Sequence, residues 1–583
     1  MHTKNIYRIF SFFCILFIPA AIFAAEKRPN VVIISAGCLG YSDLGCYGGE
    51  IKTPNLNLLA AQGLTFTQFY NCGSSEMSLA SLMTGQYPHR VGMGYPMIDL
   101  GRKCYSGSLN DDTATLAEYL KSKGYQTLAA GKWPMTLHYK IDAPRYAWPG
   151  NRGVDRFYGT ILAQSSYFDP ENVMMNASLY PKEKDYYYTD AIGREAAAFL
   201  AQAGKAERPF FLYVSFTAPG WPLQAPAADV KAYEGKYNGG WEITRARRFE
   251  QIQQRNLLPS GVKLSPRDSR VVPWNRLGDY SAWQARRMEV YAAQVTAMDR
   301  AVGVIMDGLR QIGASENTLI IFFSDAGGCA DEISAKGMAR NPAIPRAGTK
   351  KTPVQVGNDP LVLPGGPFTF QSYGVPWANV SNTPFQGYAK TVFEGGIASP
   401  CIVCWKDKIT ESGTITLPMH VVDIFPTVVE VSQSVFPNMI NGKNTLRPVG
   451  ESWVPLFSRQ TRLEILTDEK RVERFLFWES EGNSAVRNGR WKLVLPRGEK
   501  QWKLYNMVLD RAEQNDLFVQ HSRNPEILKM IQEYDAWAKR TGVEPWNNVR
   551  ALYQKMEAKK EEEKIPKKPE KFSPEDEEVE WEE

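Results

Sequence analysis

Histidine is scarce in this sequence, with five residues among 583. His2 lies in the N-terminal leader described below, which leaves His89, His138, His420 and His521. A two-zinc hydrolase site needs a cluster of histidine and aspartate ligands. No such cluster can be assembled from four histidines this far apart along the chain, which argues against a two-zinc phosphatase.

A large excess of charge is also missing. The sequence has 68 lysines and arginines against 63 aspartates and glutamates, so its formal net charge is only +5. The basic residues form no focused stripe along the sequence, whereas a nucleic-acid-binding surface needs one. We therefore expect no nucleic-acid partner.

Long hydrophobic runs are confined to the N-terminus. Residues 1–25 carry Lys4 and Arg8, then an apolar run, then small residues. This order is typical of a secretory signal peptide, here cleaved after Ala24 or Ala25. No later segment is long and apolar enough to span a bilayer. The sequence predicts an exported protein, periplasmic or secreted, with no transmembrane segment after signal cleavage.

Cysteine is sparse and odd in number outside the leader. Cys14 leaves with the signal peptide and seven cysteines remain, so at least one thiol has no partner cysteine in the chain. Their pairing cannot be read from the sequence. Cys401 and Cys404 have the spacing of a redox pair, but residues three apart on a strand point to opposite faces. We expect these two to be buried small side chains.

Two hydrophobic patterns alternate along most of the chain. Runs typical of buried strands are Asn30–Ser35, Tyr125–Ala129, Pro209–Phe216, Thr318–Ser324 and Pro400–Trp405. Amphipathic helical patterns lie between them, at Asn55–Gln62, Ala114–Lys123, Asp190–Ala203, Ala282–Gln311 and Val421–Val431. This alternation predicts an α/β fold with a large, mainly parallel sheet that is flanked by helices on both faces.

The pattern changes near residue 450. Short strand-like segments separated by turns follow, and then a helical pattern at Pro525–Thr541, which predicts a smaller antiparallel sheet with one helix. The final residues are mostly Lys, Glu and Pro, too polar to build a core. The predicted organisation is a signal peptide (1–25), an N-terminal α/β domain (26–449), a C-terminal α+β subdomain (450–550) and a charged, disordered tail (551–583).

Seven segments in a fixed order carry a family resemblance. They are RPNVVIISAGCLGYSDLGCYGG, TPNLNLLAAQGLTFTQFYN, SLMTGQYPHRVGMG, AAGKW, FTAPGWPLQAP, FFSDAGGC and NTPFQGYAKTVFEGGIASP. Together they closely resemble the arylsulfatase-type sulfatases of the alkaline phosphatase superfamily. FWESEGNSAVRNGRWKLV and WKLYNMVLDRAEQNDL resemble that family's C-terminal subdomain. The resemblance covers roughly Arg28 to Trp546 and implies the sulfatase fold.

The resemblance also implies a chemistry. In the family, a Cys or Ser is oxidised to formylglycine, and the aldehyde hydrate attacks the sulfur of a sulfate ester. A divalent cation, usually Ca²⁺, and lysines offset the charge on the sulfuryl oxygens. Histidines transfer protons, since an alkoxide leaves poorly without an acid.

The metal-binding positions of these motifs have lost their oxygen ligands. Where the family has two adjacent aspartates after the first strand, this chain has Gly37 and Cys38. Where the family has an Asp-Asn pair, the chain has Asp325 and Ala326. Ca²⁺ takes about 6–8 oxygen ligands and does not favour a thiol. We therefore predict no bound metal and no other cofactor. Asp43 is no obvious replacement, because the family has an aspartate there outside its ligand set.

The formylglycine motif is altered as well. The segment SEMSLASLMTG places Ser75 at the position that is oxidised, but the motif's proline is Met77 and its arginine is Leu79. The maturation enzymes read these two positions. We therefore expect Ser75 to stay unmodified, and an unmodified serine is a weak nucleophile without a base beside it.

Most sulfate-binding and proton-transferring groups are replaced. Lys132 is retained, but the family's histidines are Pro134 and Gly220, and the lysine of the last motif is Ala389. Lys390 follows directly, although neighbouring side chains on an extended strand face opposite ways. None of the four remaining histidines falls at a catalytic position of the motifs.

Residues that shape the backbone persist while the catalytic groups are lost. The leading interpretation is a pseudo-sulfatase, without sulfatase turnover, that binds a sulfated or other glycan or partners an active sulfatase. Lys132, Lys390 and Arg90 are the candidate ligand contacts.

Two alternatives stay open. The first is a rewired hydrolase in which Ser75 attacks a sulfate, phosphate or other ester, assisted by Lys132 or Lys390. Its nearest base would be Glu76, which we expect to be solvated. The second is a relative with no selected role.

Overall fold

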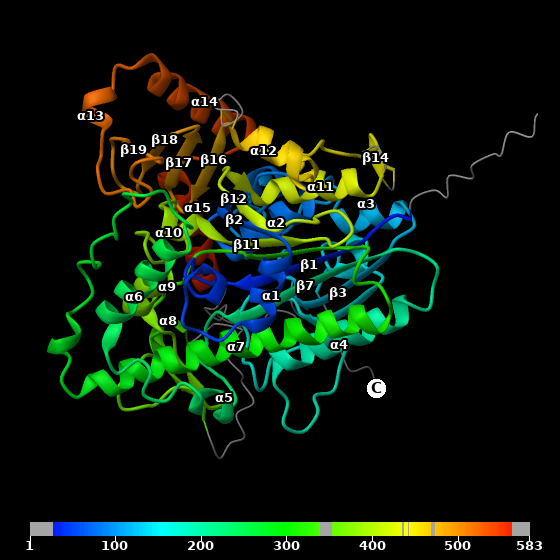
Figure 1. Cartoon of the computed structure of the whole chain (residues 1–583), viewed down its shortest axis with the longest axis horizontal. Coiled ribbons are helices and arrows are strands. Elements are labelled where there is room, and N and C mark those ends of the chain that lie inside the picture. Colours follow the sequence, from blue (N-terminus) through cyan, green and yellow to red (C-terminus); the bar gives the residue numbers. More distant parts are fainter. Residues whose placement is uncertain are drawn as a thin grey trace, which may run out of the picture.

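A computed structural model describes residues 27–138, 140, 143–338, 353–433, 436–440, 442–467 and 473–562 (Figure 1). The predicted signal peptide lies outside these residues. Within these ranges no helix combines the length and hydropathy that a bilayer crossing requires.

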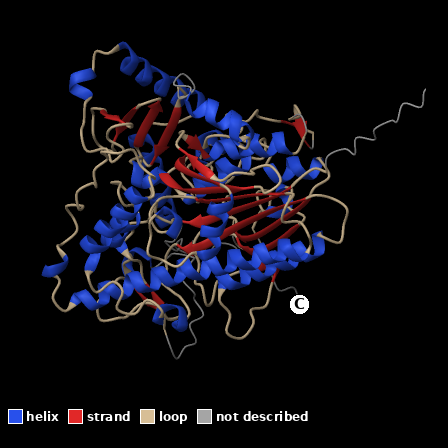
Figure 2. Ribbon diagram, viewed as in Figure 1, coloured by secondary structure: helices blue, strands red, loops and turns tan. Residues whose placement is uncertain are grey.

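A mixed sheet forms the centre of the molecule (Figure 2). Its strand order is β12-β2-β11-β8-β1-β7-β3-β4-β5-β6, and β13 pairs with β2. The strands from β8 to β4 in this order are all parallel, whereas β11 is antiparallel to both β8 and β2. The strand bounds are β1 Asn30–Gly37, β2 Leu64–Tyr70, β3 Gln126–Lys132, β4 Arg156–Thr160, β5 Met174–Met175, β6 Ser178–Leu179, β7 Phe210–Pro219, β8 Thr318–Ser324, β11 Ala398–Cys404, β12 Gly413–Ile415 and β13 Met419–His420.

Helices cover both faces of this sheet, as the alternating pattern predicts. Val32 and Ile34 of β1 belong to the core on one face, together with α1 (Pro54–Gln62), α4 (Tyr188–Ala203) and α7 (Tyr280–Gln311). Val31 and Ile33 belong to the core on the other face, with α2 (Ser75–Thr84), α3 (Leu116–Ser122) and α11 (Ile424–Val431). Figure 1 shows α7 and α4 packed side by side along the sheet.

The alternating pattern locates the main elements to within a few residues. Each of the five predicted strands and five predicted helices is present, with ends that differ by a few residues. Cys401 and Cys404 lie in the cores on opposite faces, as strand geometry predicts. The sequence pattern did not predict α6 (Gly240–Gln254), a helix of 15 residues. The other elements of this part of the chain are shorter: α5 Ala227–Lys231, α8 Ala335–Met338, α9 Gly374–Ser381, α10 Glu394–Ile397, α12 Arg459–Thr467, β9 Gln355–Val356, β10 Thr369–Phe370, β14 Met439–Ile440 and β15 Lys443–Asn444.

A four-stranded antiparallel sheet lies near the C-terminus, as predicted. Its strands are β16 Leu476–Ser480, β17 Asn483–Asn488, β18 Trp491–Leu495 and β19 Lys503–Asn506, in that order. Helix α14 (Pro525–Thr541) packs against it through Ile527, Met530 and Trp537, and α13 (Phe518–His521) precedes that helix. The domain boundary at 449/450 stays a prediction.

Buried charges lie between the two sheets. Glu394 of α10 accepts hydrogen bonds from Lys492 of β18 and from Arg511, each at 2.9 Å. The Lys492 ammonium also lies 2.7 Å from the Glu513 carboxylate. Burial raises the pKa of Glu513 to about 7, against the opposing effect of Lys492. These contacts fix the C-terminal sheet against the main one.

The prediction of a disordered tail from residue 551 was wrong for its first part. Helix α15 spans Trp546–Glu562. It holds its place because Val549 is buried against Leu100 and Tyr105, with Leu552 packed beside them. These apolar residues are too few to stand out in a Lys/Glu-rich segment. Residues 563–583 lie outside the described part of the chain.

Candidate functional site

The retained polar residues of the motifs meet at one edge of the main sheet. Strands β1, β8 and β3 are parallel to β7 or to each other, so their carboxyl ends share this edge. Strand β2 points the same way, because β2 and β8 are both antiparallel to β11. Lys132 ends β3, Asp325 follows β8, and Ser75 opens α2 after β2. Loops at such an edge are where α/β proteins build their sites.

Ser75, Lys132 and Asp325 form a closed trio. The Ser75 hydroxyl donates to Asp325 Oδ2 at 2.5 Å. Lys132 Nζ donates to the same carboxylate oxygen and to Ser75 Oγ, each at 2.7 Å. The second carboxylate oxygen, Oδ1, accepts from the Cys38 backbone N–H at 3.0 Å. The fold therefore brings these three residues together.

The trio is shut away from solvent. Relative exposure is 3% for Ser75, 2% for Lys132 and 0% for Asp325. Two opposite charges at this depth are stabilised by each other and by hydrogen bonds. Because Lys132 donates to Ser75 Oγ and Asp325 accepts the hydroxyl proton, the serine oxygen faces its partners and not a substrate.

The residues at this edge do not fit a calcium ion. A Cβ atom added at Gly37 would lie 3.1 Å from Lys132 Nζ and 2.4 Å from the Thr217 carbonyl oxygen. The ammonium group therefore stands beside the place where the family carries a metal-binding aspartate. Of the family's four ligand positions, which are all described in the structure, Asp325 alone carries a carboxylate, and Lys132 already pairs with it. Among the residues that the structure describes, no three His, Cys, Asp or Glu side chains are grouped as metal ligands.

Apolar and sulfur-bearing side chains fill the rest of the edge. Cys38, Ala326 and Cys329 form a small buried cluster, against which Trp221 and Ala389 pack. The cavity between Cys38, Cys329 and the loop of Gly220 measures about 10 Å³, which is about the smallest space that holds one water molecule. A Cβ atom at Gly220 would lie 2.9 Å from the Thr217 carbonyl oxygen.

The altered motif positions face the core. Met77 and Leu79 of α2 are 2% and 0% exposed and belong to the hydrophobic core on that face of the sheet. Pro134 is buried after Trp133, whose ring is fully buried. These substitutions extend the packing and bring no polar group to the edge.

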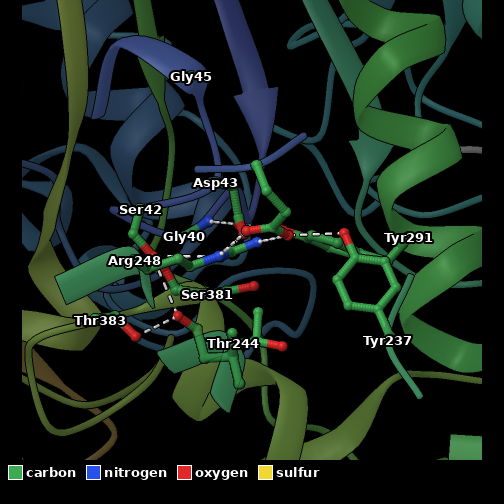
Figure 3. A network of polar contacts seen from close by, with 12 residues as sticks. Gly40, Ser42, Asp43, Gly45, Tyr237, Thr244, Arg248, Tyr291, Ser381 and Thr383 are labelled. Carbon is green, nitrogen blue, oxygen red and sulfur yellow. Dashed lines mark hydrogen bonds and ion pairs between the residues drawn. The ribbon is translucent and has the colours of Figure 1, made fainter. Parts of the chain in front are cut away.

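Asp43 is engaged in a separate network (Figure 3). Its carboxylate accepts from Arg248 at 2.6 Å, from the Tyr291 hydroxyl at 2.7 Å and from the Gly40 N–H at 2.8 Å. Arg248 also pairs with Glu50 at 2.8 Å. These contacts use both carboxylate oxygens of Asp43 and hold the loop after β1, which agrees with excluding it as a replacement ligand.

An open cleft lies outside the trio. Of its lining residues, only Ala389 and Lys390 were singled out from the sequence. Its volume is about 480 Å³, and Lys390 and Ala389 line it. Lys390 Nζ lies 3.0 Å from Asp331, which raises the pKa of Lys390 although its partial burial lowers it. The other lining residues include Arg270, Tyr388, Glu481, Asn483 and Arg497. They come from parts of the sequence that lie far apart, so only the fold brings them together.

Three other residues named in the sequence analysis, Arg90, Glu76 and His89, lie outside the trio. Arg90 is exposed at the end of a short 3-10 helix and does not line this cleft. Glu76, expected to be solvated, is only half-exposed, and burial raises its pKa. His89 is buried and lies 2.6 Å from Glu479.

Comparisons with known proteins agree with the motifs. The family model described as Sulfatase matches residues 29–434. An uncharacterised sulfatase of Schizosaccharomyces pombe is 30% identical over 541 residues, which cover 88% of this chain and 93% of the relative. An arylsulfatase of Klebsiella aerogenes is 31% identical over 445 residues, covering 73% and 91%.

Solved structures agree on the fold. The crystal structure of Ps i-CgsB aligns with a TM-score of 0.63 at 21% identity, over 91% of this chain and 98% of that one. Its complex with k-i-k-neocarrahexaose aligns with a TM-score of 0.61 at 22% identity, over 88% and 93%. By its sequence match and its fold, this chain belongs to the sulfatase family and is related to the arylsulfatases.

Proposed function

We propose that this protein is an exported pseudo-sulfatase, which keeps the sulfatase fold but does not turn over sulfate esters. The observation that carries the proposal is the position of the Lys132 ammonium, 2.7 Å from both Ser75 and Asp325. Lys132 therefore contacts both Ser75, at the family's nucleophile position, and Asp325, at the one metal-ligand position that keeps its carboxylate.

Electrostatics supports the loss of metal chemistry. At roughly 4 Å and an effective dielectric constant of about 20, two unit charges interact by about 4 kcal/mol. A divalent cation would be attracted to Asp325 by about twice that amount and repelled by Lys132 by a similar amount. The attraction and the repulsion nearly cancel, so no net electrostatic energy remains to offset the cost of removing the cation's hydration shell. Cys38 and Ala326 add no oxygen ligand.

The maturation of Ser75 gives the direct test. The full chain is expressed together with a sulfatase-maturing enzyme, and the peptide that contains Ser75 is examined by mass spectrometry. We expect unmodified serine and no hydrolysis of an aryl sulfate. An aldehyde at Ser75 together with turnover would overturn the proposal. A Cys-x-Pro-x-Arg sulfatase expressed in the same cells is the control for maturation.

The open cleft supports binding of a sulfated or other glycan. Lys390, Arg270 and Arg497 outnumber Asp331 and Glu481 among its charged lining residues, and the volume of about 480 Å³ falls within the usual range for ligand sites. The Ps i-CgsB complex with an oligosaccharide is a precedent from a protein of similar fold.

Calorimetry tests the glycan. Sulfated oligosaccharides and their desulfated forms are titrated into the wild type, into Lys390→Ala and into Lys103→Ala. Lys103 pairs with Asp112 on the surface and does not line the cleft. Binding that weakens in Lys390→Ala and persists in Lys103→Ala supports the cleft. No binding by the wild type, or equal binding by both variants, would remove the glycan from the proposal and leave an active sulfatase as the proposed partner.

A rewired hydrolase is the second candidate, because the trio itself resembles an activated serine. Asp325 accepts the Ser75 proton and Lys132 would stabilise the resulting alkoxide. Burial of all three side chains counts against access by a substrate. A panel of aryl sulfates, phosphates and carboxylate esters decides: activity that disappears in Ser75→Ala would establish this candidate, and its absence would dismiss it.

A further inference from the structure

Two thiols face each other at the edge where the family holds its metal. Cys38 directly follows β1, and Cys329 lies five residues after the end of β8. The Cys38 and Cys329 side chains pack in the same small cluster. They are 9% and 7% exposed, they belong to one small cluster with Ala326, and both line the same 10 Å³ cavity.

We propose that Cys38 and Cys329 form an intrachain disulfide that joins the loop after β1 to the loop after β8. These are the two loops that carry the family's metal ligands, so a covalent bond would connect them where a cation does so in the family. The inference concerns the link between the loops and holds whether or not the cleft binds a glycan.

The surroundings favour this pair over other pairings. A disulfide requires side chains that approach one another across a Cα separation of about 4.4–6.8 Å, and Cys38 and Cys329 share one small cluster and line one cavity. The recorded sulfur contacts of other cysteines are to different groups: Cys72 to Ser81 and His420, and Cys404 to the Gln62 carbonyl. Cys401 is buried within β11.

The backbone at Cys38 also suits a fixed link. Its φ is 57°, in the left-handed region that residues with a Cβ adopt infrequently and at a cost. A covalent bond from its sulfur would hold this conformation.

The oxidation needs an external disulfide, such as oxidised glutathione or a disulfide-bonded oxidoreductase. One protein thiolate attacks that disulfide, forms a mixed disulfide and expels one thiolate. The second protein thiolate then attacks the protein sulfur of the mixed disulfide and expels the other. Two protein thiols are oxidised, the external disulfide is reduced, and the two protons pass to the released thiols. Because the 10 Å³ cavity cannot admit this oxidant, the exchange takes place before the two loops close during folding.

Peptide mapping tests the bond. The full chain, without its leader, is refolded with oxidised and reduced glutathione, its free thiols are alkylated in denaturant, and it is digested with trypsin. Residues 28–52 contain Cys38 and Cys46, and residues 311–336 contain Cys329. We expect these two peptides to be joined without reductant and separate with it. Free, alkylated Cys38 and Cys329 in the folded chain would overturn the inference.

Three cysteine variants show which residues form the bond and distinguish Cys38 from Cys46, which lies in the same tryptic peptide. The joined peptide should disappear in Cys38→Ser and in Cys329→Ser and persist in Cys46→Ser, which alters the same tryptic peptide. Reductant should lower the Tm of the wild type and of Cys46→Ser by about 4 °C, since closing a loop of this length limits the unfolded chain strongly. Persistence of the joined peptide in Cys38→Ser would assign the bond to Cys46 and refute the proposed pair.

Discussion

The substitution Lys132→Met tests whether Lys132 stabilises the folded protein through its buried ion pair with Asp325. The substitution keeps the apolar stem of the side chain and removes its charge. Asp325, which is fully buried, would keep only the hydrogen bonds from Ser75 and from the Cys38 N–H. Removing one partner of a buried ion pair costs about 3–5 kcal/mol. For a chain of this length that loss corresponds to a decrease in Tm of about 3–4 °C.

Urea denaturation and thermal melting of the purified chain measure the effect. The double variant Lys132→Met/Asp325→Leu removes both charges, and we expect its stability to lie within about 1 kcal/mol of the wild type. Lys103→Ala breaks the exposed pair with Asp112 and should cost less than about 1 kcal/mol. If Lys132→Met is as stable as Lys103→Ala, or if the double variant is no better than the single one, the trio is not a stabilising unit and the reasoning fails.

Three further predictions follow from the packing and from one titrating group. Gly37→Ala places a Cβ atom 2.4 Å from the Thr217 carbonyl oxygen, so it should lower the unfolding free energy by about 1–3 kcal/mol in urea denaturation; an unchanged midpoint would mean that the strand end yields easily. Leu79→Arg, which restores the family's arginine, buries a charge in the hydrophobic core and should reduce the yield of folded protein, with no aldehyde formed at Ser75; normal folding together with aldehyde formation would contradict the account. Burial raises the pKa of Glu513 from 4.5 to about 7, so the folded state binds a proton more tightly than the unfolded state. The resulting contribution to the free energy of unfolding is complete below pH 4.5 and is lost as the pH rises through 7. Glu513→Gln mimics the protonated form, and the stability of the wild type relative to this variant, from urea titrations between pH 4.5 and 8, should therefore fall as the pH rises; a constant difference would refute the assignment.

The fold could be predicted from the sequence because its signals are local. A fully apolar run such as Thr318–Ser324 has the length and bounds of a buried strand, and the structure places β8 there without change. The long helical pattern at 282–311 likewise became α7, with two more residues at its start. The last helix was missed because its few apolar residues, such as Val549, pack on residues from distant parts of the sequence.

The site could be predicted only in part. The motifs identify Ser75, Lys132 and Asp325 as positions, but nothing in the sequence says that the lysine reaches across to both of the others. Lys132 can make both contacts because Gly37 has no side chain in the space beside the Lys132 ammonium group. The motif shows the glycine but not how close the lysine lies to it. Cys329 ends the segment FFSDAGGC, but nothing in the sequence places its side chain beside that of Cys38.

Calcium binding tests the central claim most directly. Crystals of the protein are soaked in calcium chloride, and the anomalous difference density is examined between Cys38 and Asp325, while calorimetry measures binding in solution. The account predicts no ordered ion there, with Lys132 Nζ still hydrogen-bonded to Asp325, and no heat of binding. A fully occupied ion coordinated at about 2.3–2.6 Å, with Lys132 displaced, would contradict it.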